Sequence, residues 1–370
     1  MTVSKDELLA FFKEMYTMRR VEISNDTEYK VRKQFMLRAN SQNRDDDEKF
    51  NHQAKNIRGF CHLYDGQEAV ASGMQAALKK EDSWITSYRC HCVALLRGST
   101  PEQIFAELFG FSHGTSKGKG GSMHFYSKEN NFFGGQGIVG AQVPVGAGLA
   151  FAAKYNTKPG EKMPIAIACY GDGAANQGQI WESANMCKLW DLPMVFVIEN
   201  NHYGMGTSTG RSSCNNEYYT MGGRTIPGIK INGMNVLAVK QGFAMVREHC
   251  SSGKGPMYVE FDTYRYHGHS MSDPGDTYRT RNAVDSVRQL RDPIEYVKKL
   301  LIDNSLTTVE EMKGVEKAIR NSVQESLIAA KTGKFAPNDW MYREIHSTPE
   351  LKDEPIKYIR MPDIQKSIHN

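Results

Sequence analysis

The sequence predicts an α/β fold built on a doubly wound, mostly parallel sheet, with helical N- and C-terminal extensions. From residue 59 to about 266, short apolar runs that end in glycine or polar residues alternate with helical segments. Two such runs, 164–170 and 193–198, flank residues 176–189, which have the length and polarity of a crossover helix. A strand, helix and strand in this order form a parallel unit with a right-handed crossover.

Three regions follow one another along the chain, and we expect them to form one domain. Residues 1–58 are an N-terminal helical segment with a polar insertion at about 38–55, which we expect to be solvated. Residues 59–285 are the α/β core, and residues 286–370 are a C-terminal helical region and tail that follow the helix-start signal Asp292-Pro293. The best strands of the core are 84–88, 165–170, 194–198 and 257–264.

The composition is typical of a globular protein, with 370 residues of which 40% are hydrophobic and 24% charged. The net charge of +4 is small, and no basic stripe indicates a nucleic-acid partner. No apolar run reaches transmembrane length, and residues 1–18 read as neither a signal peptide nor a presequence. Seven cysteines without Cys-x-x-Cys pairs favour a reducing compartment.

Oxygen-bearing side chains follow two neighbouring strands of the predicted sheet. Asp172 lies in Gly171-Asp172-Gly173 after the first strand, and Asn201 follows the second. Gly-Asp-Gly alone is ordinary turn chemistry, but parallel strands bring both residues to one crevice at the carboxyl edge of the sheet. Carboxylate, amide and main-chain oxygens are a donor set for Mg²⁺, which commonly shares such a site with phosphates.

Five ordered blocks resemble the alpha subunits of thiamine-diphosphate-dependent 2-oxo acid dehydrogenases. The blocks are 59–68, 118–124, 137–142, 171–179 and 264–274, and the resemblance runs from about residue 19 to about 303. It implies the thiamine-diphosphate-binding fold, with thiamine diphosphate and Mg²⁺ as cofactors. Residues 174–178 and 267–270 look like the pyruvate-type members of the family.

The resemblance also implies roles for single residues. Asp172 and Asn201 would give side-chain oxygens to Mg²⁺, and Tyr203 its main-chain carbonyl. His62 and His269 would lie beside the reacting carbon and the cofactor, where imidazoles can exchange protons or donate to a developing alkoxide. His91 and His267 are weaker candidates. Further cofactor contacts would come from Tyr88, Arg89, Ser127, Gly137, Val139, Gly173, Ala174 and His269.

The activity that the resemblance implies is decarboxylation of pyruvate and transfer of the acetyl unit to a lipoyl group on a dihydrolipoamide acetyltransferase. Enzymes of this kind activate the aminopyrimidine ring with a glutamate from a second α/β domain. This chain becomes helical after about residue 292, so we expect a beta subunit to supply that glutamate in a two-alpha, two-beta assembly. The expected compartment is the mitochondrial matrix, with bacterial cytoplasm as the alternative.

The polar segment 267–281 resembles a regulatory phosphorylation loop. The resemblance implies phosphorylation at Ser270, Thr277 and Ser208 by a kinase, with reversal by a phosphatase. A phosphate on Ser270, next to His269, would add charge and bulk at the mouth of the site. The simpler interpretation is that these are ordinary loop hydroxyls.

Three alternatives stay open. Within the family, the chain could belong to a branched-chain 2-oxo acid or acetoin dehydrogenase. A nicotinamide dehydrogenase is suggested by Gly135-x-Gly137-x-x-Gly140 with Glu161 twenty residues on, although residues 130–134 look loop-like where that fingerprint needs a strand. An inactive scaffold is the third, against which the intact Asp172 and Asn201 count.

Overall fold

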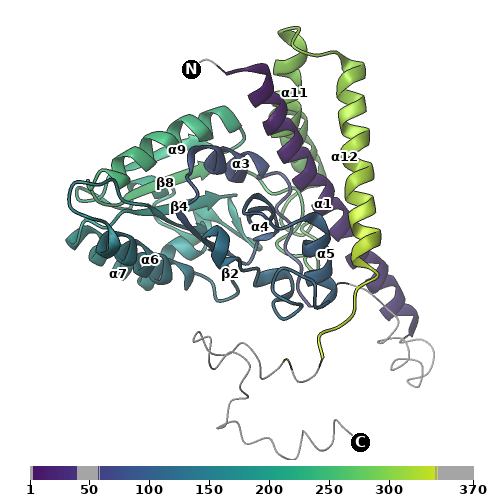
Figure 1. Ribbon diagram of the computed structural model, residues 1–370, viewed down its shortest axis with the longest axis horizontal. Coiled ribbons are helices and arrows are strands. Elements are labelled where there is room, and N and C mark those ends of the chain that lie inside the picture. The colour runs from purple at the N-terminus through teal and green to yellow at the C-terminus, as the bar shows by residue number, and fades with distance from the viewer. Residues whose placement is uncertain (1–2, 40–56, 58, 338–339, 341–370) are drawn as a thin grey trace, which may run out of the picture.

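A six-stranded sheet forms the centre of the computed structural model, which describes residues 3–39, 57, 59–337 and 340. The strand order is β2-β1-β3-β4-β8-β7, and every neighbouring pair is parallel. Helices cover both faces of this sheet (Figure 1), so the predicted doubly wound α/β class is confirmed. The strands are β1 (Ser83–Ser87), β2 (Phe132–Gln136), β3 (Ala166–Gly171), β4 (Met194–Asn200), β7 (Gly228–Asn232) and β8 (Met257–Asp262). A separate antiparallel pair is β5 (Tyr203–Gly204) with β6 (Thr207–Ser208).

Each face of the sheet has its own apolar core, because successive side chains of a strand point to opposite faces. In β3, Ile167 and Cys169 join the core that contains α3 (Glu68–Ala77) and α9 (Val236–Ser251). Ala168 and Tyr170 join the other core, which contains α6 (Gln142–Asn156) and α7 (Gly178–Leu189). Covering both faces explains why β3 and β4 are continuous apolar runs rather than alternating ones.

A layer of long helices lies beside the sheet (Figure 1). It contains α1 (Lys5–Ala39), α11 (Pro293–Asp303) and α12 (Val309–Ala330), which pack together and against α5 (Pro101–Phe109). The predicted helix start is confirmed, since the Asp292 side chain accepts hydrogen bonds from the first amides of α11. Among the described helices, none combines the length and apolarity that crossing a membrane requires. The shorter helices are α4 (His91–Leu96), α8 (Thr209–Ser212), α10 (Arg281–Arg291), η1 (Gly121–Met123), η2 (Lys128–Asn130), η3 (Ala174–Asn176) and η4 (Tyr218–Thr220).

The structure differs from the sequence prediction in three places, one of which is β7, a strand that was not among those predicted. The loop predicted at 130–134 is wrong, because β2 begins at Phe132 and pairs with β1 at the edge of the sheet. Its glycines hide the strand signal, since glycine has low strand propensity. Helix α10 was not predicted, and the boundary expected at residue 285 falls inside it. Most of the polar insertion, residues 40–55, lies outside the described residues.

Asp82 joins three elements of the fold just before β1. Its carboxylate accepts from Arg247 Nε of α9 at 2.7 Å and from the amide of Ile165 at 2.9 Å, and its side chain is fully buried. We expect Asp82→Ala to lower the free energy of unfolding by about 3 to 5 kcal/mol, because it removes the buried carboxylate that pairs with Arg247 and leaves that guanidinium only the half-exposed Glu81, whose Oε1 lies 3.8 Å away. Urea denaturation measures the loss. A change below about 1 kcal/mol, the range of an exposed pair, would contradict this role.

Candidate cofactor-binding site

A cavity of about 190 Å³ lies at the carboxyl ends of the central strands. β2 and β3, the next two strands in the sequence, pair with opposite edges of β1, so the strand order reverses at β1. Such switch points are where open α/β sheets bind ligands. Strand ends supply the wall: Tyr88 and Arg89 directly follow β1, Asp172 directly follows β3, and Asn201 directly follows β4, while Arg265 lies three residues after the end of β8.

Oxygen atoms suited to a cation gather on one side of this cavity. Asp172 is 2% exposed, its Oδ2 has no hydrogen-bond partner among the described residues, and burial raises the pKa of its carboxyl. Arg265 Nη1 donates to Asn201 Oδ1 at 3.0 Å and contacts the Tyr203 carbonyl at 3.4 Å. A positive group therefore already touches two of the three oxygens that the sequence predicts as metal ligands. The described residues contain no cluster of three or more His, Cys, Asp or Glu side chains that could hold a metal by themselves.

Positive charge faces the same cavity from two buried guanidinium groups. Arg89 donates to the carbonyls of Leu63 and His269 at 2.6 and 2.8 Å, and so cannot turn away from the cavity freely. Burial, followed by repulsion from Arg89 and Arg279, lowers the pKa of Arg265 to about 10. Guanidinium groups held together at such a cost indicate a site that is completed by an anion.

Glycines leave room for a ligand's phosphate groups between these charges. A Cβ atom placed on Gly171 would meet nothing within 4 Å, and one on Gly173 would meet only Gly204 at 3.7 Å. Gln67 Nε2 and Gln142 Oε1, both buried in the wall, have no hydrogen-bond partner among the described residues. Open glycine backbone, unpaired polar atoms and two cations together fit a diphosphate with its cation.

A larger cavity of about 460 Å³ adjoins the first and is lined by aromatic rings. The His62 ring lies 4.4 Å from that of Tyr88 and 5.4 Å from that of His269. Burial, and then the charge of Arg89, lower the pKa of His62 to about 2 and that of His269 to about 4. Both rings are therefore neutral near pH 7. The Nδ1 atoms of both are buried without a hydrogen-bond partner among the described residues, so both can bind a ligand.

The depressed pKa of His269 predicts how stability changes with pH. The folded state binds fewer protons than the unfolded state below the ordinary value of 6.5, so this contribution to stability is complete above pH 6.5 and is lost down to about pH 4. We expect His269→Asn to flatten the fall in melting temperature between pH 6.5 and 4, measured without added cofactor. A variant curve parallel to the wild-type curve would contradict the prediction.

Most of the sequence-predicted cofactor residues line one of the two cavities, but Ser127 does not. It pairs with Phe132 at the amino end of β2, and its hydroxyl is bonded to Glu129 and to Asn130. The cavities lie at the opposite edge of the sheet, at the carboxyl ends of the strands, so we do not retain Ser127 as a cofactor residue. The smaller cavity includes Tyr88, Arg89, Val139, Asp172, Gly173, Ala174, Asn201, Tyr203 and His269, and the larger one includes His62, Gly137 and again Tyr88, Val139 and His269.

Sequence reasoning missed five polar residues of the smaller cavity, one of which is Ser87 at the end of β1. Arg265, Gln67 and Gln142 lie inside blocks that resemble the family, and Arg265 also directly follows the predicted strand 257–264. Glu199 lies outside the blocks and carried no such signal. Burial raises the pKa of Glu199 to about 7, and its carboxylate accepts a hydrogen bond from the Tyr64 hydroxyl. Glu199 therefore adds a group that can change charge near neutral pH at the floor of the cavity.

The weaker histidine candidates are engaged elsewhere. His91 is fully buried between Glu22 and Ser122, and lines neither of these two cavities. His267 Nδ1 lies 2.6 Å from Asp65 Oδ2, and this contact raises the pKa of His267 although burial opposes it.

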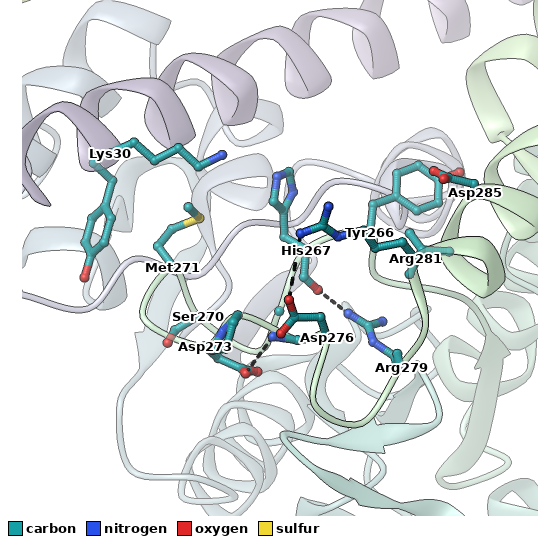
Figure 2. A pocket seen from close by; sticks show the side chains of 15 residues that line it. Lys30, Tyr266, His267, Ser270, Met271, Asp273, Asp276, Arg279, Arg281 and Asp285 are labelled. Atoms are coloured by element: carbon teal, nitrogen blue, oxygen red, sulfur yellow. Dashed lines mark hydrogen bonds and ion pairs between the residues drawn. The ribbon is translucent and has the colours of Figure 1, made fainter. Parts of the chain in front are cut away.

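The predicted regulatory segment forms a tight loop between the larger cavity and α1. Arg279 donates to the carbonyls of Arg265 and His267 at 2.7 and 2.6 Å, which closes the loop on itself. The contact with His267 is visible in Figure 2. Ser270 is 5% exposed, and its hydroxyl lies 2.8 Å from that of Ser272. Thr277 is exposed, and Ser208 ends β6 in the hairpin beside the cavities.

The fold places the acidic residue of the nicotinamide alternative at the wrong edge of the sheet. Gly135 does lie within a strand, which removes one objection from the sequence. Glu161, however, is exposed and precedes β3, so it lies toward the amino edge of the sheet. The fingerprint needs an acidic residue at the carboxyl edge, where it can reach a ribose. The arrangement does not fit dinucleotide binding.

The fold and the two cavities define an α/β protein with a site at the carboxyl edge of its sheet that fits a diphosphate-bearing cofactor. Comparison with known families narrows this class: the chain belongs to the Dehydrogenase E1 component family, whose model matches residues 32–338. It is 52% identical over 328 residues to the pyruvate dehydrogenase E1 component subunit alpha-1, mitochondrial, of Arabidopsis thaliana, covering 89% of this chain and 77% of the relative. A probable alpha subunit of the same kind from Caenorhabditis elegans, also named mitochondrial, is 47% identical over 94% of this chain and 80% of its own length.

Proposed function

We propose that this chain is the alpha subunit of a mitochondrial pyruvate dehydrogenase that binds thiamine diphosphate and Mg²⁺. The observation that carries the proposal is the cluster at the ends of β3 and β4, where Asp172, Asn201 and the Tyr203 carbonyl face two guanidinium groups across open glycine backbone. About half of the residues are identical to those of relatives named for this activity. Asp172, Asn201 and Tyr203 would hold Mg²⁺, while Arg89 and Arg265 would neutralise the diphosphate.

Thiamine diphosphate supplies the electron sink that decarboxylation of a 2-oxo acid requires. The residues of this chain would bind the cofactor and orient the substrate beside it. A pKa near 2 makes His62 a poor proton acceptor, so its neutral ring acts as a hydrogen-bond donor toward oxygen that gains negative charge. His269, in the wall shared by both cavities, can orient cofactor and substrate together.

A beta subunit would complete the site. The described lining of the larger cavity has one acidic residue, Asp273, which already accepts from the His269 amide and the Tyr278 hydroxyl. No glutamate lines that cavity among the described residues, so the aminopyrimidine ring would be activated in trans. Ile138, beside the mouth, and Phe151 and Tyr155 on α6 are exposed apolar side chains suited to a subunit contact. The acetyl unit would then pass to the lipoyl group of a dihydrolipoamide acetyltransferase.

Coexpression with a beta subunit of the same organism tests the proposal. Native mass spectrometry in the presence of thiamine diphosphate and Mg²⁺ should give two alphas, two betas and two cofactors. The assembly should decarboxylate pyruvate with an artificial electron acceptor and should prefer it to branched-chain 2-oxo acids. An assembly that binds no thiamine diphosphate, or one that prefers branched substrates, would overturn the proposal or its substrate.

Phosphorylation of Ser270 by a kinase, reversed by a phosphatase, would switch this activity off. Ser270 is buried and lines the larger cavity together with Asp273, so a phosphate there would add bulk and negative charge at a position shared with a carboxylate. We expect Ser270→Glu to lower pyruvate turnover on the order of 100-fold, the equivalent of about 3 kcal/mol. Thr277→Glu, at an exposed position, is the matched control and should cost less. Normal turnover by Ser270→Glu would contradict the mechanism.

A further inference from the structure

The glycine-rich segment 114–121 wraps around a single buried carboxylate. Glu107, near the end of α5, is fully buried and accepts four main-chain hydrogen bonds from this segment. Its Oε2 accepts from the amides of Ser116 and Gly118, both at 2.8 Å. Its Oε1 accepts from those of Gly120 at 2.7 Å and Gly121 at 3.1 Å. A concave set of amides of this kind binds anions, and here the anion is the protein's own glutamate.

The glycines of this segment are explained by the closeness of the wrapping. A Cβ on Gly114 would lie 2.5 Å from Glu107 Oε2, and one on Gly118 would lie 2.5 Å from the Gly110 carbonyl. Gly118 and Gly121 also adopt φ of 75° and 60°, where other residues are strained. The segment therefore resembles a phosphate-binding loop in composition only, because Glu107 already uses the amides that a phosphate would need.

The wrapped segment leads directly to the larger cavity. Ser122 follows it, and the Ser122 hydroxyl lies 2.9 Å from His91 Nε2 and accepts from the His62 amide at 3.4 Å. Met123 lines the larger cavity together with His62. The Met123 carbonyl also lies 2.4 Å from where a Cβ on Gly135 would be, so the turn packs against the strand that leads to Gly137 and Val139. The turn 121–123 thus supports two walls of the cavity.

We propose that Glu107 is a positioning residue for the reaction, acting through Ser122 and Met123 on His62. Its carboxylate sets the path of 116–121, and that path decides where the Ser122 hydroxyl meets the His62 backbone. Glu107 lines neither cavity and touches no ligand position. The inference rests on the proposed function for its kinetic readout, and on hydrogen exchange for a readout that does not depend on activity.

The main variants are Glu107→Gln and Ser122→Ala in the two-alpha, two-beta assembly. Glutamine keeps the size of the side chain but turns one acceptor oxygen into a donor that faces amide donors. We expect Glu107→Gln to lower kcat about 10- to 100-fold, as misplacement of a catalytic group by about 1 Å does, with thiamine diphosphate affinity and assembly mass unchanged. Ser122→Ala, which removes only one hydroxyl, should lower kcat in the same direction and by less. Ser72→Ala is the matched control, because that buried hydroxyl donates to Glu14 in the helical layer.

Two further measurements separate positioning from general stability. In a His62→Asn background, Glu107→Gln should cause little additional loss of kcat, because both changes act on one group. Hydrogen exchange followed by mass spectrometry should become faster in the peptide that contains His62 in both Glu107→Gln and Ser122→Ala, and not in Ser72→Ala.

Unchanged exchange at His62, or full additivity with His62→Asn, would overturn the positioning role. If Glu107→Gln does not fold, Ser122→Ala alone decides between these outcomes. A wild-type assembly without pyruvate activity would refute the proposed function, and the exchange at His62 would still decide this inference.

Discussion

Replacement of Asp172 by alanine is expected to reduce pyruvate decarboxylation by at least about 100-fold, through loss of cofactor binding. Loss of an outer partner of a metal ligand already costs about 10- to 100-fold in metal affinity, so loss of a ligand should exceed that range. Asp172 has a buried oxygen without a partner and gives the cation side of the cavity its carboxylate. Removing it leaves Arg265 as the main charge beside Asn201 and takes away the reason for Mg²⁺ to bind.

The Asp172→Ala experiment has a clear thermodynamic signature. Titration calorimetry should show weaker binding of thiamine diphosphate at a fixed Mg²⁺ concentration, and high cofactor concentrations should restore part of the activity. Asp303→Ala is a suitable control, because Asp303 is exposed at the end of α11, far along the chain from the cavities. Unaltered affinity for both Mg²⁺ and thiamine diphosphate in Asp172→Ala would show that the metal site lies elsewhere.

His62→Asn is expected to lower kcat and to leave cofactor binding unchanged, the opposite of the result expected for Asp172→Ala. His62 lines the larger cavity and not the smaller one, so the diphosphate contacts remain. Groups that donate to or exchange protons with a reacting centre contribute about 10²- to 10⁴-fold, and we expect kcat to fall within that range. Because the low pKa keeps the ring neutral, loss of this residue should not shift the acid limb of the kcat profile above pH 5.

The His62 prediction is measured by steady-state kinetics on the assembled enzyme together with a cofactor titration. His249→Asn, a change in α9 away from both cavities, should leave kcat and cofactor affinity near their wild-type values. A His62→Asn enzyme with normal kcat and weakened cofactor binding would place His62 in the binding site and not at the reacting centre.

The order of elements in the core was predictable because strand and helix periods are local properties. Residues 165–170 and 194–198 are apolar throughout, and both are buried strands of the parallel sheet. β2 was not predicted because it contains Gly134 and Gly135, which are poor strand formers. The fold brings Phe125, Met123 and Cys90 so close to these two positions that a larger residue would not fit. Helix α10 was not predicted although Val284, Val287 and Leu290 recur in it at helical spacing, and the structure fully buries none of its side chains.

The residues of the site also divide into those that the sequence could place and those that it could not. Asp172 and Asn201 could be placed together from the sequence, since parallel strands deliver the residues that follow them to one edge. Gln142 reaches the cavity from the start of a helix and lies in the block 137–142, whereas Glu199 reaches it from the end of a strand without a motif of its own. Ser127 was expected in the site from resemblance alone, and its place at the amino end of β2 argues against a cofactor contact.

The sequence by itself determined the fold class, the strand ends that carry chemistry and the family, because these depend on local pattern and on motifs with fixed spacing. Only the tertiary structure decided the electrostatic state of the site. The low pKa values of His62 and His269, the pairing of Arg265 with Asn201 and the enclosure of Glu107 by amides depend on burial and distance between residues far apart in the chain. Desolvation and Coulomb energy follow position in space, which no local sequence pattern encodes.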